Sequence, residues 1–314
     1  MKKFSALLIT LIVATALKAQ TATPMAQYAG NQLIYNPGFA GAHDLFSANI
    51  SYRTLWVGIP NSPTLISFNM HAPFVGLRNS LGFIYQRETV GPQFINIVNM
   101  TYAHKIPLGE SSFLSLGVQG GLLNAVTDWD MVDEIRHEWD IALGQGRMVT
   151  NRFDMNLGAY FQAPNFYLGL AVRHLTAPSF DEVRSFETNE VFASQIRRQF
   201  FFMGGYNFML NLDWDLRPRV LMRYKHGMPL TVSAGLDVVY ANRFTFGTNF
   251  MTGQNAVSLM AAAEVIEGLR IGYAFCINFG SLQSFQRGSH EIFISFFLPV
   301  WNRVNDPQIR QHFR

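Results

Sequence analysis

Residues 153–175 contain two runs in which apolar side chains alternate with polar or small ones. The first run, 153–161, carries Phe, Met, Leu, Ala and Phe at alternate positions, and the second, 166–173, carries Phe, Leu, Leu and Val in the same way. Ala163–Asn165 separates them. A period of two, a turn and a period of two again predict a β-hairpin. Its apolar face requires either the core of a soluble sandwich or the lipid around a membrane barrel.

Composition favours the membrane alternative. The chain is 49% hydrophobic and 14% charged, whereas roughly a quarter of residues are charged in typical globular chains. Beyond the N-terminus, no segment approaches the ~18 uninterrupted apolar residues of a membrane helix. High apolar content in short alternating runs is typical of a transmembrane β-barrel. The single cysteine, Cys276, allows no intramolecular disulfide.

The N-terminus predicts export. Lys2 and Lys3 precede the apolar run Phe4–Leu17, and small residues follow, so residues 1–19 read as a secretory signal peptide. This places the mature chain in a bacterial periplasm, outer membrane or cell exterior. Removing residues 1–19 also removes Lys18, which leaves 21 basic against 21 acidic residues and a net charge of zero. A neutral mature chain gives no case for nucleic-acid binding.

The same alternation recurs along the chain and predicts an antiparallel barrel of about 14 strands, an even number as single-chain outer-membrane barrels prefer. The expected strands are 46–56, 64–71, 80–87, 93–104, 112–121, 153–161, 166–172, 200–210, 216–224, 231–239, 243–250, 255–264, 269–277 and 290–299.

Charged residues on the alternating strands indicate a polar interior. In Leu216–Tyr224 the arginines all fall on one face, which would be ruinous in a small dry core but is ordinary in a wet lumen. The candidate lumen residues are Asp154, Arg173, Arg217, Arg219, Arg223, Asp237 and Arg243. Three roles are open for the arginines: lining an anion path, pairing with acidic lumen residues, or holding a plug. In the hairpin, Asn156, Tyr160 and Tyr167 share the lumen face, while Phe153, Met155, Leu157, Phe166, Leu168 and Leu170 are expected to face lipid.

Connection lengths predict an orientation. Tight connections are expected at 163–165, 211–213, 240–242 and 265–268, and long ones at 122–152, 174–199 and 278–289. Counted along the strands, the long connections fall on one side and the tight ones on the other. Outer-membrane barrels carry long loops outside and short turns in the periplasm, so both termini are expected to be periplasmic. Aromatic residues near strand ends suit interfacial girdles: Trp56, Tyr102, Trp214, Tyr224 and Tyr240.

Catalytic patterns are absent from the sequence. There is no Gly-x-Ser-x-Gly, no His-Glu-x-x-His and no phosphate-cradling glycine loop. Ser289-His290-Glu291 contains triad residue types, but neighbouring strand residues point to opposite faces. The acidic stretch 128–140 lacks the glycine and terminal glutamate of a calcium loop, so a solvated surface is expected there, with calcium binding or a basic partner as alternatives. A short amphipathic helix is expected over 129–143. We expect no enzyme, cofactor, metal or small-molecule substrate.

Several motifs, taken in order, resemble the PorP/SprF family of Bacteroidota outer-membrane proteins. They are Asn36-Pro37-Gly38-Phe39-Ala40-Gly41, Tyr52-Arg53-Thr54-Leu55-Trp56-Val57-Gly58, Gly91-Pro92, Tyr167 with Gly169 and His174, Gly272-Tyr273, and His290-Glu291. Two departures stand out: Leu55 replaces the usual glutamine, and Cys276-Ile277 follows where the family commonly has aspartate. Alternation places Arg53 toward the lumen.

The resemblance implies a non-enzymatic barrel of the type IX secretion and gliding machinery. Such a barrel acts in secretion with periplasmic or lipoprotein subunits, or as the partner of a secreted surface adhesin, whose C-terminal region it helps to export or tether. A diffusion channel or hydrophobic-solute transporter is the alternative. The expected organisation is a signal peptide (1–19), a periplasmic or lumen-plugging segment (20–42), the barrel (43–300) and a periplasmic tail (301–314).

Overall fold

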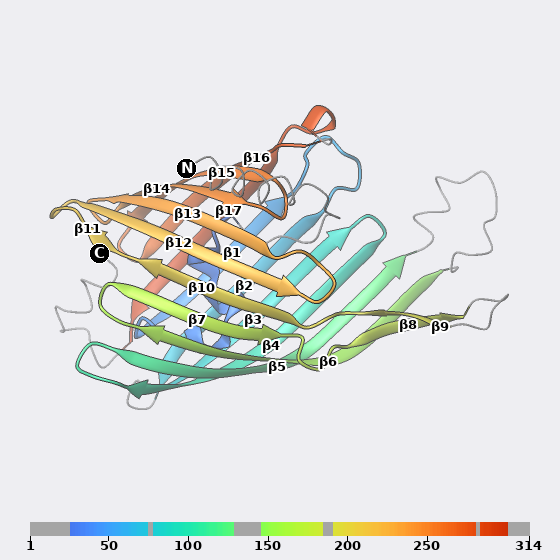
Figure 1. Ribbon diagram of the computed structural model, residues 1–314, viewed down its shortest axis with the longest axis horizontal. Helices are drawn as coiled ribbons and strands as arrows, with labels where there is room; N and C mark the ends of the chain where they lie inside the picture. The colour runs from blue at the N-terminus through green and yellow to red at the C-terminus, as the bar shows by residue number, and fades with distance from the viewer. Residues whose placement is uncertain (1–25, 75–77, 129–145, 185–190, 281–282, 301–314) are drawn as a thin grey trace, which may run out of the picture.

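The computed structural model describes residues 26–74, 78–128, 146–184, 191–280 and 283–300. The signal peptide, most of the acidic stretch 128–140 and the tail 301–314 lie outside these ranges. Strands of alternating sequence pair antiparallel with their neighbours and close into a ring of fourteen (Figure 1). The predicted antiparallel barrel of about 14 strands is therefore confirmed. No helix in the described ranges is long and apolar enough to cross a membrane.

The ring follows chain order. Its first seven strands are β1 (Leu45–Thr54), β2 (Thr64–Phe74), β3 (Asn79–Val90), β4 (Gln93–Pro107), β5 (Phe113–Asp128), β6 (Arg147–Gln162) and β7 (Phe166–Arg173). The other seven are β10 (Gln199–Tyr206), β12 (Trp214–Lys225), β13 (Thr231–Tyr240), β14 (Phe244–Met251), β15 (Ala256–Ile266), β16 (Leu269–Asn278) and β17 (Ser289–Pro299). The ring closes where β17 pairs with β1, in a register that sets Arg53 opposite Glu291.

Three short strands complete the sheet structure. β11 (Phe208–Met209) continues β10 after an interruption at Asn207 and also pairs with β12. β8 (Ser179–Arg184) and β9 (Val191–Gln195) form a separate hairpin beyond the ring. The sequence predicted one unbroken strand over 200–210, which is wrong because the strand is interrupted at Asn207. The long connection predicted over 174–199 is seen, and it contains the β8–β9 hairpin.

Two rims follow from the chain order. The short-turn rim carries the connections 163–165, 210–213, 241–243 and 267–268, and the opposite, long-loop rim carries 129–146, 174–198 and 279–288. The predicted separation of tight and long connections is therefore seen. The 122–152 connection is shorter than expected, because β5 and β6 stay paired up to Asp128 and Arg147. Backbone pairing continues there although the side-chain alternation has been lost.

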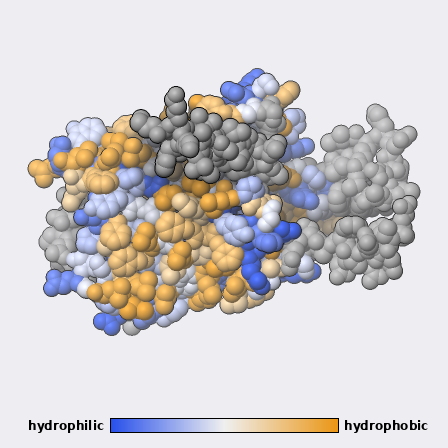
Figure 2. All heavy atoms as spheres, in the orientation of Figure 1, coloured by the Kyte–Doolittle hydropathy of each residue, from blue (hydrophilic) through white to orange (hydrophobic). Residues whose placement is uncertain are grey.

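The outer surface of the barrel is apolar. Side chains expected to face lipid are exposed in the isolated chain, among them Phe153, Leu157, Phe166, Leu168 and Leu170. Figure 2 shows such apolar side chains gathered over the strand face. Tyr102, Trp214, Tyr224 and Tyr240 are exposed as well, whereas Trp56 lies beyond the end of β1 with a positive φ of 49°. The inward positions are mostly polar, so the two faces separate as a membrane barrel requires.

Candidate functional site

The barrel encloses the segment Ala26–Asp44, which we call the plug. It contains two short 3-10 turns, η1 (Tyr28–Asn31) and η2 (Pro37–Phe39), with a single helical turn, α2 (Gln32–Tyr35), between them (Figure 1). Every residue from Asn31 to Ala42 is buried. A segment this short cannot bury its own side chains, so the barrel wall supplies the surface that covers them.

Glu291 of β17 holds the first residues of the plug. Its carboxylate accepts hydrogen bonds from the backbone N–H groups of Ala26 (2.9 Å) and Gln27 (3.2 Å). Arg53 Nε of the neighbouring strand β1 lies 3.6 Å from Glu291 Oε2, and both side chains are buried. A buried carboxylate requires charge and hydrogen-bond partners. Arg53 supplies the opposite charge for Glu291, and the plug supplies the hydrogen-bond donors. Arg53 faces the lumen, as alternation predicts.

A second ion pair lies against the Tyr28 ring. Arg219 donates two hydrogen bonds to Asp237, at 2.7 and 2.9 Å. The Arg219 guanidinium carbon is 4.9 Å from the centre of the Tyr28 ring, within range of a cation–π interaction. Burial raises the pKa of the Tyr28 phenol far above its usual value, so the ring is neutral. Of the roles considered for the lumen arginines, Arg219 fills two, because it pairs with an acid and packs on the plug.

The Asn36-Pro37 motif docks on the inner face of the β6–β7 hairpin. Asn36 Nδ2 donates to the Ala159 carbonyl of β6 at 2.9 Å, and Asn36 Oδ1 accepts from the Gly38 N–H at 2.9 Å. Pro37 begins η2, where its missing N–H costs nothing. The side chain thus caps its own turn and ties that turn to the wall.

Three inward glycines make this docking possible, and we call them the glycine floor. They are Gly117 of β5, Gly158 of β6 and Gly169 of β7. A Cβ on Gly117 would stand 2.3 Å from the Pro37 carbonyl carbon, and one on Gly169 would stand 2.7 Å from Asn36 Nδ2. A Cβ on Gly158 would lie 2.0 Å from Asn36 Oδ1. Such distances are far inside van der Waals contact, so the wall must lack side chains where the motif sits.

The end of the plug is held by strands β2 and β4. The Gly41 N–H donates to His71 Nδ1 at 3.0 Å. Gly41 has a φ of +69°, and a Cβ there would overlap Ser80, so glycine is required for both conformation and space. Lys105 of β4 then forms an ion pair with Asp44 as the chain leaves the plug for β1.

Aromatic rings fill the space between these attachments. Phe39 packs edge-on against Tyr160, with ring centres 5.3 Å apart, and Tyr160 stacks on Tyr167 at 5.6 Å. Tyr35 meets Phe201 of β10 at 5.7 Å. These contacts give the plug an apolar core of its own inside a polar lumen.

The candidate lumen residues divide into two groups. Asp154, Arg173, Arg219, Arg223 and Asp237 are buried inward-facing residues, and Arg217 is half-buried beside Asp215, with which it forms an ion pair at 2.7 Å. Arg243 is different. It is exposed in the 241–243 turn, where Nε donates to the Glu264 carbonyl at 3.0 Å, so its assignment to the lumen was wrong. The predicted strand began one residue too early, at Arg243, which belongs to the turn before β14.

The remaining motif residues support the long-loop rim or the wall. Asp154 Oδ2 lies 2.7 Å from His174 Nδ1, which fixes the end of β7. Gly91 and Pro92 form the β3–β4 turn, and the Gly91 N–H donates to the Asn61 carbonyl at 3.2 Å. Trp56 lies in the connection after β1, and its backbone N–H donates to Ser289 Oγ at 3.1 Å.

Motif residues on β16 and β17 divide between the two faces. Tyr273 points outward, and its hydroxyl is 2.6 Å from His290 Nδ1. Gly272 points inward, where an added Cβ would meet the Phe293 ring at 2.1 Å. Ser289 and Glu291 are buried while His290 is not, so these three residues do not converge on one site. The described residues contain no group of three side chains able to hold a metal ion.

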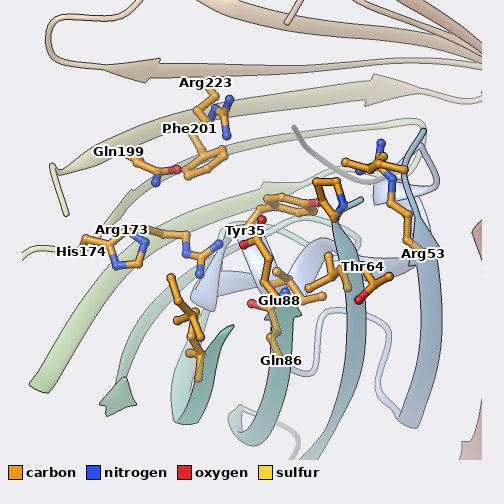
Figure 3. A pocket seen from close by; sticks show the side chains of 16 residues that line it. Tyr35, Arg53, Thr64, Gln86, Glu88, Arg173, His174, Gln199, Phe201 and Arg223 are labelled. Atoms are coloured by element: carbon orange, nitrogen blue, oxygen red, sulfur yellow. The ribbon is translucent and has the colours of Figure 1, made fainter. Parts of the chain in front are cut away.

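A cavity of about 150 Å³ lies above the plug, toward the long-loop rim. Ile34 and Tyr35 of the plug form its floor, and Arg53, Glu88, Arg173 and Arg223 stand around it (Figure 3). Each of these four charged residues is among the last three residues of its strand, at the end near the long-loop rim. Arg53 is on β1, Glu88 on β3, Arg173 on β7 and Arg223 on β12. Alternation in the sequence places all three arginines in the lumen. It does not predict that they lie around one cavity, because their strands are far apart in the chain. The signal for the glycine floor was present as inward glycines in alternating strands.

A closed fourteen-stranded barrel with an apolar outside and a polar, plugged inside defines an outer-membrane β-barrel protein. Solved barrels share this fold. The toluene transporter TbuX of Ralstonia pickettii matches with a TM-score of 0.52 and 9% identity, covering 88% of this chain and 95% of its own. The toluene transporter TodX of Pseudomonas putida matches with a TM-score of 0.48 and 9% identity, covering 91% and 97%. At 9% identity, the likeness to TbuX concerns the fold alone.

The model of the type IX secretion system membrane protein family PorP/SprF matches residues 17–296. The chain therefore belongs to the PorP/SprF family. A comparison with the curated proteins finds no match. The family and the structural neighbours are secretion components and channels rather than enzymes.

Proposed function

We propose that this protein is a non-enzymatic, plugged barrel of the type IX secretion machinery. It would act as a secretion component or as the partner for export and surface anchoring of a secreted adhesin. The observation that carries the proposal is the plug, which is bonded to the wall at its start by Glu291, at its centre by Asn36 and at its end by His71. Family membership supports the secretion context.

A firmly seated plug changes what the barrel can do. Displacing it would break these buried hydrogen bonds, each of which costs about 1–3 kcal/mol when its partner is left unsatisfied. Spontaneous opening would then be infrequent, which does not suit a passive pore. The surfaces left for function are the two rims, with the long-loop rim and its β8–β9 hairpin at the cell surface and the short-turn rim in the periplasm. The binding of partner proteins at these two rims would fit a docking role.

Affinity capture from detergent-solubilised outer membranes tests this proposal. Tagged protein is expected to bring down periplasmic or lipoprotein subunits of the secretion system, or the C-terminal region of a secreted adhesin. A variant with residues 180–194 replaced by a short Gly-Ser linker provides the comparison, and heat-modifiable gel mobility confirms that its barrel is intact. Recovery of the monomer alone, after mild cross-linking in cells, would contradict a docking role.

The alternative is a diffusion channel or hydrophobic-solute transporter. The cavity beneath the long-loop rim is the observation in its favour, since it gives a solute a place to enter. Planar-bilayer recording separates the two functions. The plugged partner gives a closed baseline with rare openings, whereas steady large currents from the wild-type protein would favour the channel.

A further inference from the structure

A row of amide side chains crosses the outer face of the barrel near the long-loop rim, and we call it the amide row. It joins Asn96 of β4, Asn124 of β5 and Asn151 of β6, which are neighbours in register. Asn96 Nδ2 donates to Asn124 Oδ1 at 3.1 Å, and Asn124 Nδ2 donates to Asn151 Oδ1 at 2.8 Å. Alternation places the row on the same face as the exposed Leu122 and Phe153. The amide row is therefore polar and faces outward.

The amide row lies where the apolar band of a membrane barrel should end. Along β4, the outward residues between Asn96 and His104 are exposed: Val98, Met100 and Tyr102. At the far end of this run, the Tyr102 hydroxyl donates to Asn79 Oδ1 at 2.8 Å. From His104 to Asn96 the strand runs eight residues, which is about 27 Å, or about 21 Å along the membrane normal at a tilt of about 40°. Outer-membrane barrels have an apolar band about 25 Å tall, so the amide row marks its boundary with the lipid headgroups.

Two exposed arginines stand at this boundary. Arg87 of β3 lies opposite Asn96 in register, and Arg147 is the first residue of β6. Both pack on the ring of Phe94, with 4.6 and 5.7 Å between the guanidinium carbons and the ring centre. Among the described residues, neither arginine forms an ion pair within 4.0 Å. We call Arg87, Phe94 and Arg147 the arginine clamp.

The arginine clamp carries more positive than negative charge. On the outward face of β3 to β6, within the described ranges, the acid that accompanies the two arginines is Asp128, opposite Arg147 in register. The contact with Phe94 uses the faces of the guanidinium groups and leaves N–H donors at their edges. The amide row does not supply acceptors to them, because its amides bond to one another. An anion with several acceptor oxygens would match these donors.

Depth in the membrane decides which anion meets the clamp. The clamp is on the lipid-facing side, directly beyond the apolar row that contains Val98, Leu122 and Phe153. A lipid whose acyl chains lie along that row brings its phosphate to the level of the clamp. Arginine suits a phosphate because its fork of N–H donors matches two phosphate oxygens.

We propose that the arginine clamp binds the phosphate of a lipid headgroup in the leaflet at the long-loop rim, with the acyl chains along the apolar row below it. The site would order lipid against the β3–β6 wall. It depends on the barrel spanning a membrane and not on the partner role.

Native mass spectrometry of the full mature chain in detergent tests the site. The probes are dioleoyl phosphatidic acid and dioleoylglycerol, which share their acyl chains and differ in the phosphate. Phosphatidic acid should be retained at least tenfold more tightly. Inorganic phosphate, at an ionic strength matched with chloride, should not displace it. Equal retention of the two lipids by the wild-type protein overturns the proposal, and displacement by inorganic phosphate overturns the assignment to lipid.

Arg87→Gln and Arg147→Gln locate the binding. An arginine near an anionic lipid surface contributes about 1 kcal/mol, a factor of about five, so each variant should bind phosphatidic acid about fivefold more weakly and the double variant about twenty-five-fold. The matched control is Arg243→Gln. Arg243 also lies over a ring, 5.8 Å from the centre of Phe244, but its donors are engaged by the Glu264 and Val265 carbonyls. Unchanged affinity in a folded double variant, or an equal loss in the control, overturns the assignment.

Discussion

Replacing Gly158 by alanine should loosen the plug. The added Cβ would stand 2.0 Å from Asn36 Oδ1 and 2.8 Å from Pro37 Cδ, and the wall strand β6 is paired on both sides and has little room to shift. Overpacking of this kind costs about 1–3 kcal/mol. Moving Asn36 away also breaks its 2.9 Å bond to the Ala159 carbonyl, which adds about 1–3 kcal/mol for the buried groups left unsatisfied.

Together these costs lower the free energy of plug opening by about 2 kcal/mol at the least. Amide exchange of residues 26–44 through local opening should then accelerate by roughly thirtyfold or more, since 1.4 kcal/mol is a factor of ten. Hydrogen–deuterium exchange with mass spectrometry measures this rate. Planar-bilayer recordings should show more frequent openings in the same variant.

Gly120→Ala is the matched control. Gly120 lies on β5 next to the glycine floor but faces outward, and its added Cβ would meet Phe153 at an ordinary 3.4 Å. Exchange of the plug should be unaffected by it. If Gly158→Ala folds, as judged by heat-modifiable mobility, and its plug still exchanges at the wild-type rate, then close contact with the glycine floor does not hold the plug in place.

Three further results are expected. Glu291→Gln removes the carboxylate charge beside the buried Arg53 side chain and weakens the bonds to the start of the plug, so protease cleavage within residues 26–44 should become faster. Equal cleavage would show that the Glu291 charge does not hold the plug. Asp237→Asn removes the partner of Arg219 and should destabilise the barrel by about 3–5 kcal/mol in urea unfolding. The double variant Asp237→Asn with Arg219→Met should recover part of that lost stability. No recovery would argue against the pairing. Leu170→Arg puts a charge on the lipid face and should cost about 2–4 kcal/mol of folding free energy in lipid vesicles, and a neutral effect would contradict the assigned face.

The hairpin at 153–175 shows how far alternation reaches. Its faces were read correctly because a strand's side chains alternate regardless of what surrounds it. The turn at Ala163–Asn165 followed from the interruption of that pattern, and the Ala163 N–H donates to the Phe166 carbonyl at 2.9 Å. Near the rims the same reasoning failed, as it did for Arg243 and for the long extensions of β5 and β6. There the pairing partner, not the side-chain pattern, decides where a strand ends.

Much of this protein was thus determined by local sequence: the strands, the number in the ring, the lipid and lumen faces, and the motifs that mark the family. Only the tertiary structure decided what the inward residues do. Asn36 meets Ala159 across 123 residues of chain, and Ala26 meets Glu291 across 265. No periodicity encodes such contacts, because they arise from closing the sheet and folding the first described segment back into it. The glycines of the hairpin read as small residues on a polar face, and the closed barrel makes them the surface on which the plug rests.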